Sequence, residues 1–178
     1  YHDPLSPDAP IAFIFSPLVG SPLTTSAKFA VVSRSPLTGR LNDSLASSSF
    51  ALAGKKTGHD AIVVSGRAAE PSILVIDEDQ VQLQPAAELW GMTVEEADRH
   101  LKENQPAGSQ AVVIGPAGEN LVHFATLSHD GRHAGRGGSG AVLGAKNIKA
   151  VVVRGSRRCR WDQPAKLVEL ARDLSDRS

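Results

Sequence analysis

The stretch "DGRHAGRGGSGAVLGAKNIKAVVVRG", residues 130–155, joins a glycine-rich, positively charged segment to an apolar run. Five glycines fall within its first eleven residues, together with Arg132, His133 and Arg136. The small residues that follow predict a helix, and "KAVVVRG" at 149–155 is typical of a buried strand. A helix start offers unpaired N–H groups, and glycine lets an anion approach the backbone closely. The stretch therefore predicts a phosphate-type anion site, with close helix–sheet packing through small residues as the alternative.

A similar order of elements occurs earlier in the chain, which indicates a duplication. Both units share a Phe-Ala pair, a following serine, a lysine near the helix end and a closing glycine. The expected elements are strands 11–15 and 28–35, helix 44–58 and strand 60–66 in the first unit, and strands 110–115 and 121–128, helix 138–147 and strand 149–155 in the second. We therefore predict a duplicated, β-rich α+β domain with pseudo-twofold symmetry. Chance matching of a few letters is the alternative.

Three further elements are expected outside the repeat. They are a hairpin over 72–84, a helix over 93–104 and a helix over 162–176. The second of these begins with a Thr-x-x-Glu capping box. In the last one, Asp162 is expected to cap the helix and Pro164 to occupy its first turn.

Composition restricts the possible functions of the 178 residues. Lysine plus arginine and aspartate plus glutamate both total 19, so no basic excess favours nucleic-acid or acidic-membrane binding. The apolar runs are far shorter than the roughly 20 residues of a membrane span. The single cysteine, Cys159, cannot form an internal disulfide and cannot alone hold an iron–sulfur cluster. These features favour a cytoplasmic protein.

A longer segment carries a family resemblance. "IGPAGENLVHFATLSHDGRHAGRGGSGAVLGAKNIKAVVVRG" (114–155) closely resembles the signature region of the tungsten-containing aldehyde ferredoxin oxidoreductase family. "DPLSP" (3–7), "PLTTSAKFAVVSRSPLTG" (22–39) and the segment 58–91 agree with the family in the same order. The resemblance implies an N-terminal, pterin-binding domain over 1–155 that lacks its first ~50 residues. Residues 156–178 would be a linker and the start of a following helix.

The resemblance also implies a cofactor. It is a tungsten or molybdenum bis-pterin whose two phosphates are bridged by Mg²⁺. The positions that match the family's contacts are Arg132, His133 and Gly135 in the second repeat and Lys28, Leu45 and Ser47 in the first. The main-chain carbonyls of His133 and Leu45 would serve Mg²⁺. No catalytic side chain is expected here, because the pterin supplies the sulfur ligands of the metal.

The first repeat departs from the family pattern at three positions. Lys28 stands where the family usually has arginine, Leu45 where it has asparagine, and Ser47 where it has glycine. Lysine keeps the charge but loses the guanidinium fork, and serine adds bulk where backbone is otherwise bare. His129 and Asp130 could also reach a cofactor, or could simply form a turn pair.

The implied function is oxidation of an aldehyde to a carboxylate. Electrons would leave through a [4Fe–4S] cluster, held by further domains of the same protein, to ferredoxin. A homodimer is possible, and the 178 residues alone are expected to be inactive. The alternative is a non-catalytic binding or scaffold domain that kept the fold and lost the cofactor.

Overall fold

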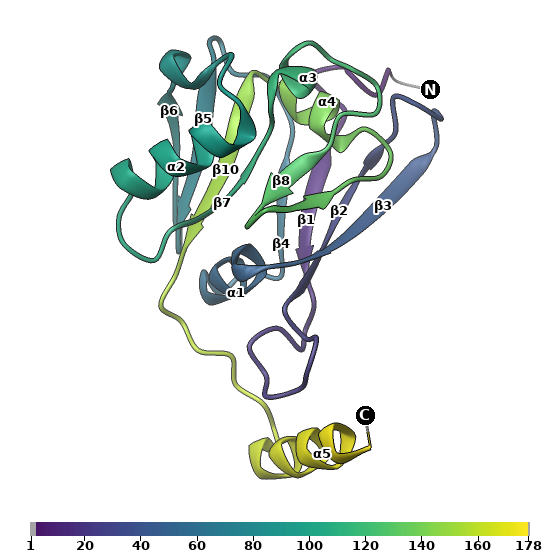
Figure 1. Cartoon of the computed structure of the whole chain (residues 1–178), viewed down its shortest axis with the longest axis vertical. Coiled ribbons are helices and arrows are strands. Elements are labelled where there is room, and N and C mark those ends of the chain that lie inside the picture. Colours follow the sequence, from purple (N-terminus) through teal and green to yellow (C-terminus); the bar gives the residue numbers. More distant parts are fainter. Residues whose placement is uncertain (1–2, 178) are drawn as a thin grey trace.

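A computed structural model of the chain describes residues 3–177 and contains two β-sheets with helices between and beside them (Figure 1). The strands are β1 (Ile11–Phe15), β2 (Lys28–Arg34), β3 (Leu41–Ser47), β4 (Ala61–Val64), β5 (Ser72–Asp77), β6 (Gln80–Pro85), β7 (Gln110–Val113), β8 (Leu127–His129), β9 (Arg132–Ala134) and β10 (Ile148–Arg154). The helices are α1 (Ser49–Lys56), the short 3-10 turn η1 (Ala87–Leu89), α2 (Val94–Asn104), α3 (Pro116–Glu119), α4 (Ser139–Gly144) and α5 (Pro164–Asp176).

Sheet topology confirms the duplication. The first sheet has the order β3-β2-β1-β4, and the second contains β9-β8-β7-β10 in the corresponding order. Every neighbouring pair in these two sets is antiparallel, and a helix, α1 or α4, precedes the last strand of each set. The β5–β6 hairpin extends the second sheet, with β5 parallel to β10. The fold is thus a duplicated α+β domain.

Both repeats share one core. Helix α1 contacts β1 of its own repeat and also β7 and β10 of the other, while α4 contacts its own β10 and also β1 and β2. Phe50 of α1 is fully buried, and its ring lies 5.1–6.0 Å from the rings of Phe13, Phe15 and Phe29. The two helices therefore join the sheets through a common apolar interior rather than covering separate ones.

The central strand β10 is buried on both faces, as its continuous apolar sequence predicts. Val151 and Val153 lie in the core between the sheets, whereas Ala150 and Val152 pack with α2 on the other face. The predicted capping box of α2 is present, with Thr93 and Glu96 exchanging side-chain and backbone hydrogen bonds. Helix α5 follows an extended segment and lies beyond both sheets (Figure 1).

Two predicted elements are shorter than expected. Residues 44–47 continue strand β3 instead of starting a helix, because Ser44 and Ala46 are buried while Leu45 is exposed, and that period of two suits a strand. The helix starts only after Ser48, whose hydroxyl caps it. In the second repeat, strand β8 covers only the end of the predicted 121–128. Leu121 adopts a left-handed φ of 56°, and the N–H of Ala125 donates to the carbonyl of Val122 in a turn.

The shared Phe-Ala letters are therefore not structurally equivalent. Phe29 is 1% exposed within β2, whereas Phe124 is 68% exposed in the loop before β8. The segment between the two predicted strands 110–115 and 121–128 contains the short helix α3. At α5 the capping position is Gln163 rather than Asp162, and no side chain caps the helix.

Two lysines that follow α4 in the sequence are buried. Lys149 forms an ion pair with Glu119, and the side chains are 0% and 4% exposed. Its ammonium also donates to the carbonyl of Met92 at 2.8 Å. Lys146 donates to the carbonyls of Pro7 and Gly66, and burial lowers the pKa of its ammonium. These bonds fix loops around the second repeat.

Candidate functional site

The outer strands of the two repeats, β3 and β9, meet along a seam. The side-chain amide of Asn42 donates to the carbonyl of Arg136 at 3.2 Å, and the amide of Arg136 donates to the Ser44 hydroxyl at 3.2 Å. At the other end, the backbone N–H of Ser49 donates to the carboxylate of Asp130 at 2.8 Å. Side chains of each repeat therefore bond the backbone of the other.

The repeat relates the positions along this seam. Ala46 and Ala134 are both buried, and each pairs with a buried residue of the next strand inward, Phe29 or Leu127. They are therefore structurally equivalent. One residue before them stand Leu45 and His133, and one residue after them stand Ser47 and Gly135. Thus four of the six predicted contact positions occupy matching places on or directly after the two seam strands.

The two remaining positions lie beside them. Lys28 begins β2 directly opposite Ser47, and its ammonium donates to the Ser47 hydroxyl at 3.1 Å. Arg132 begins β9 and is exposed. The structure therefore brings all six predicted positions to the seam region, three from each repeat. Of the three positions in the first repeat, Lys28 supplies the positive charge. Leu45 is apolar and 66% exposed, and Ser47 is neutral.

The second repeat is richer in hydrogen-bond donors. Nδ1 of His133 lies 2.7 Å from the Ser128 hydroxyl and 3.4 Å from that of Thr126. Arg132 and Arg136 are exposed, and within residues 3–177 neither guanidinium has a carboxylate at ion-pairing distance. Unpaired guanidinium groups are suited to phosphate or carboxylate.

The structural reason for glycine differs from one position of the stretch to the next. At Gly138, with φ of +76°, an added Cβ would lie 1.9 Å from the carbonyl oxygen of His123, and at Gly140 it would lie 2.4 Å from that of Thr126. These two glycines are required by close packing. At Gly135 an added Cβ would meet only a methyl of Thr126 at 3.8 Å, which is an ordinary contact. The bare backbone at Gly135 therefore leaves open space that a ligand can occupy.

The helix start at which the anion site is predicted lies inside the fold. Residues 138–144 are buried, and the N–H of Gly140 donates to the carbonyl of Ala125. The N–H of Gly140 is thus satisfied by protein rather than free for an anion. The open space and the unpaired charge lie instead on β9 and just after it.

Some features of the seam escaped the sequence prediction. Asp130 and Gly131 form a two-residue turn with φ of 46° and 68°, and they join β8 to β9. An Asp-Gly pair is a strong hairpin signal, and it marks this turn in the sequence. The contacts of Ser128 and Thr126 with His133 have no such signal, because they depend on the register of the hairpin.

His129 does not face the seam surface. Its side chain is buried at 2% exposure, its ring lies 5.1 Å from that of Phe29, and neither ring nitrogen has a hydrogen-bond partner within the described residues. Burial lowers the pKa of this imidazole, and Arg132 and His133 act in the same direction while Asp130 opposes them. His129 therefore belongs to the core, where burial favours its neutral imidazole.

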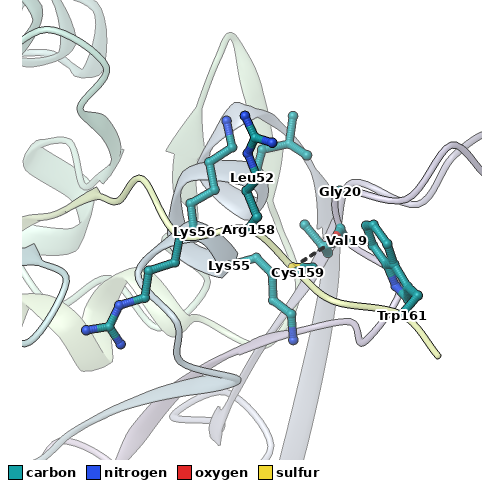
Figure 2. A pocket seen from close by; sticks show the side chains of 9 residues that line it. Val19, Gly20, Leu52, Lys55, Lys56, Arg158, Cys159 and Trp161 are labelled. Atoms are coloured by element: carbon teal, nitrogen blue, oxygen red, sulfur yellow. Dashed lines mark hydrogen bonds between the residues drawn. The ribbon is translucent and has the colours of Figure 1, made fainter. Parts of the chain in front are cut away.

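A pocket of about 220 Å³ lies at the other end of α1 (Figure 2). Its wall combines apolar groups with a basic rim, and its lining residues include Val19, Leu52, Lys55, Lys56, Arg158, Cys159 and Trp161. The thiol of Cys159 lies 3.6 Å from the carbonyl of Val19. In residues 3–177, no group of three or more His, Cys, Asp or Glu is placed to hold a metal ion. No helix of that range is long and apolar enough to cross a membrane.

Comparison with known proteins identifies the family. The model of the domain described as "Aldehyde ferredoxin oxidoreductase, N-terminal domain" matches residues 1–155. The chain belongs to the aldehyde ferredoxin oxidoreductase family. It is 40% identical over 173 residues to the tungsten-containing aldehyde ferredoxin oxidoreductase of Pyrococcus horikoshii, which covers 96% of this chain and 28% of that protein. The enzyme of the same name from Pyrococcus furiosus is 42% identical over 159 residues, covering 87% and 26%.

Proteins named for other reactions contain a similar domain. The aliphatic sulfonate oxidoreductase, WOR-like subunit, of Pyrococcus furiosus is 33% identical over 168 residues, covering 86% of this chain and 27% of that protein. The active-site complex BamBC of benzoyl coenzyme A reductase matches in structure with a TM-score of 0.93 and 33% identity, covering 98% and 27%. The aldehyde ferredoxin oxidoreductase family and the fold predicted from sequence are thus confirmed, and the chain spans little more than a quarter of these relatives.

Proposed function

We propose that this chain is the cofactor-binding N-terminal domain of an aldehyde:ferredoxin-type oxidoreductase. The observation that carries the proposal is the seam, where two equivalent strands present matching positions from both repeats beside unpaired cationic side chains. A doubled scaffold suits a cofactor with two similar halves. Family membership supports the tungsten or molybdenum bis-pterin as that cofactor.

The residues of the seam fit the phosphates of such a cofactor. Arg132 offers a forked set of N–H donors and Lys28 offers a point charge, so each repeat contributes one cation. Gly135 leaves space beside the strand, and the backbone there can approach a ligand. The main-chain carbonyls of His133 and Leu45 would hold a Mg²⁺ ion, since this cation takes oxygen ligands.

In the proposed reaction an aldehyde and water give a carboxylate, two electrons and three protons. The cofactor supplies the redox chemistry when it is bound, and this domain supplies binding and electrostatics. The electrons would pass through a [4Fe–4S] cluster, held by other domains, to ferredoxin. Because relatives that share this domain bear the names of different reactions, we assign the choice of substrate to the rest of the protein. Residues 156–178 would connect the domain to those parts.

The proposal predicts the metal content of the full-length protein. When it is produced anaerobically with tungstate or molybdate, about one metal atom and two pterins per chain are expected. Elemental analysis and pterin fluorescence measure both. The exposed Arg132→Met variant should retain less cofactor than wild type, whereas Arg99→Met on α2 should retain the same amount. A folded full-length protein with neither metal nor pterin would instead support the scaffold alternative.

A further inference from the structure

His133 is the position at which the two halves of the seam differ most in chemistry. Its equivalent in the first repeat is Leu45, an apolar side chain that is 66% exposed. An exposed leucine offers no hydrogen bond, whereas an imidazole offers a donor or an acceptor at each nitrogen. The repeat therefore places a polar group on one side of the pseudo-twofold axis only.

The ring of His133 is held from behind. Ser128, whose hydroxyl lies 2.7 Å from Nδ1, is 2% exposed and pairs with both Val113 and His133 in the sheet. The Thr126 hydroxyl lies 3.4 Å from the same nitrogen. When the Ser128 hydroxyl donates to Nδ1, the ring proton is on Nε2. Within residues 3–177, Nε2 has no hydrogen-bond partner and the residue is exposed.

The imidazole of His133 and the open space at Gly135 both adjoin Thr126. His133 and Gly135 are two residues apart, so they share one face of the extended chain. Thr126 marks that face, because its hydroxyl bonds the His133 ring and its methyl is the nearest atom to a Cβ added at Gly135. A ligand group that occupies the space at Gly135 is therefore within reach of the His133 side chain.

We propose that His133, through its Nε2–H, binds an anionic phosphate oxygen of the ligand held at the seam, and that Ser128 is its positioning residue. This role of the side chain is separate from that of the main-chain carbonyl. The proposal rests on the proposed function, since the cofactor supplies the phosphate. The first repeat has Leu45 at this place, so the two halves of the seam bind their phosphates unequally.

The test measures how fast the cofactor leaves the full-length protein. Holoprotein is incubated in buffer containing excess inorganic phosphate, and tungsten or molybdenum and pterin retained on the chain are followed with time. His133→Ala is expected to release both about tenfold faster than wild type, the usual effect of losing one hydrogen bond to a charged group. His133→Gln should restore part of the loss, because its amide also donates.

The positioning role has its own variants. Ser128→Ala should speed release, and Ser128→Thr, which keeps the hydroxyl, should return it toward the wild-type rate. His100→Ala, at a half-buried histidine of α2, is the matched control and should change nothing. Circular dichroism and the melting temperature of each apoprotein verify that the fold is unchanged.

A second measurement needs no loaded enzyme. In the full-length apoprotein, inorganic phosphate should shift the imidazole NMR signals of His133 and leave those of His100 in place. Wild-type and His133→Ala holoproteins that release cofactor at the same rate would overturn the role of His133 while the proposed function stands. Wild-type protein that carries no pterin would overturn the proposed function first.

Discussion

For buried polar side chains, the fold decides which hydrogen bonds form and which protonation state is favoured. His129 has both ring nitrogens without a partner inside the described part of the chain, and its ring packs edge-on against Phe29. Its neutrality costs less than a buried positive charge would, which is why burial lowers its pKa. The buried ammonium of Lys149, by contrast, has hydrogen-bond partners in Glu119 and the Met92 carbonyl.

His129 predicts a dependence of stability on pH. Its pKa in the fold lies below the ordinary value of 6.5, so below about pH 6.5 the unfolded chain binds more protons than the folded one. The contribution of His129 to the free energy of unfolding should therefore be constant above that pH. It should fall as the pH falls through 6.5. Urea denaturation between about pH 8 and pH 5 measures it.

The variant His129→Leu should reduce this loss, because it removes the titrating group and its two unpaired nitrogens. His100→Leu is the control, and it should retain the wild-type pH dependence. An unchanged pH profile in His129→Leu would show that another group causes the loss.

At the scale of single elements, α4 packs through backbone. An added Cβ at Gly144 would lie 2.1 Å from the carbonyl oxygen of Gly118 in α3. Similarly, an added Cβ at Gly118 would lie 2.9 Å from the carbonyl oxygen of Gly140. Small residues therefore let the two helices approach each other, which is the packing explanation of most of the glycine-rich stretch.

This packing predicts contrasting effects of two alanine substitutions. Gly144→Ala should destabilise the fold by about 1–3 kcal/mol, because the clash involves backbone that cannot rotate away. Gly135→Ala, where the added methyl meets only Thr126 at 3.8 Å, should change stability by less than about 0.5 kcal/mol. Chemical denaturation of both variants measures the difference. Equal destabilisation would mean that Gly135 also has a packing role.

Sequence patterns predicted elements well where burial follows a simple period. The hairpin over β5 and β6, helix α2 with its capping box, and the buried strand β10 all agree with prediction. Strand β3 was missed because its serines and alanine also suit a helix, and only pairing along the whole of β2 decides between them. Local propensity is a weak prior that tertiary pairing overrides.

At the scale of the whole molecule, the two repeats are expected to unfold together. Helices α1 and α4 each contact strands of both repeats, and one core includes residues of both sheets. Native-state hydrogen exchange should therefore give one common maximum free energy of opening for the core amides of β2 and β10. Far-ultraviolet circular dichroism should show a single transition. Separate plateaus for the two strands would show that the repeats open independently.

The sequence by itself determined the family, the duplicated α+β plan and the six positions expected to contact a cofactor. It did so because a long ungapped match to the family and the period-two pattern of buried residues can both be recognised from the order of residues alone. Only the tertiary structure showed that β3 and β9 meet, and that Ser128 orients His133 beside the open space at Gly135. The reason is physical: such contacts depend on strand register and on how the two sheets pack, and residues far apart in the chain carry no local signal of either.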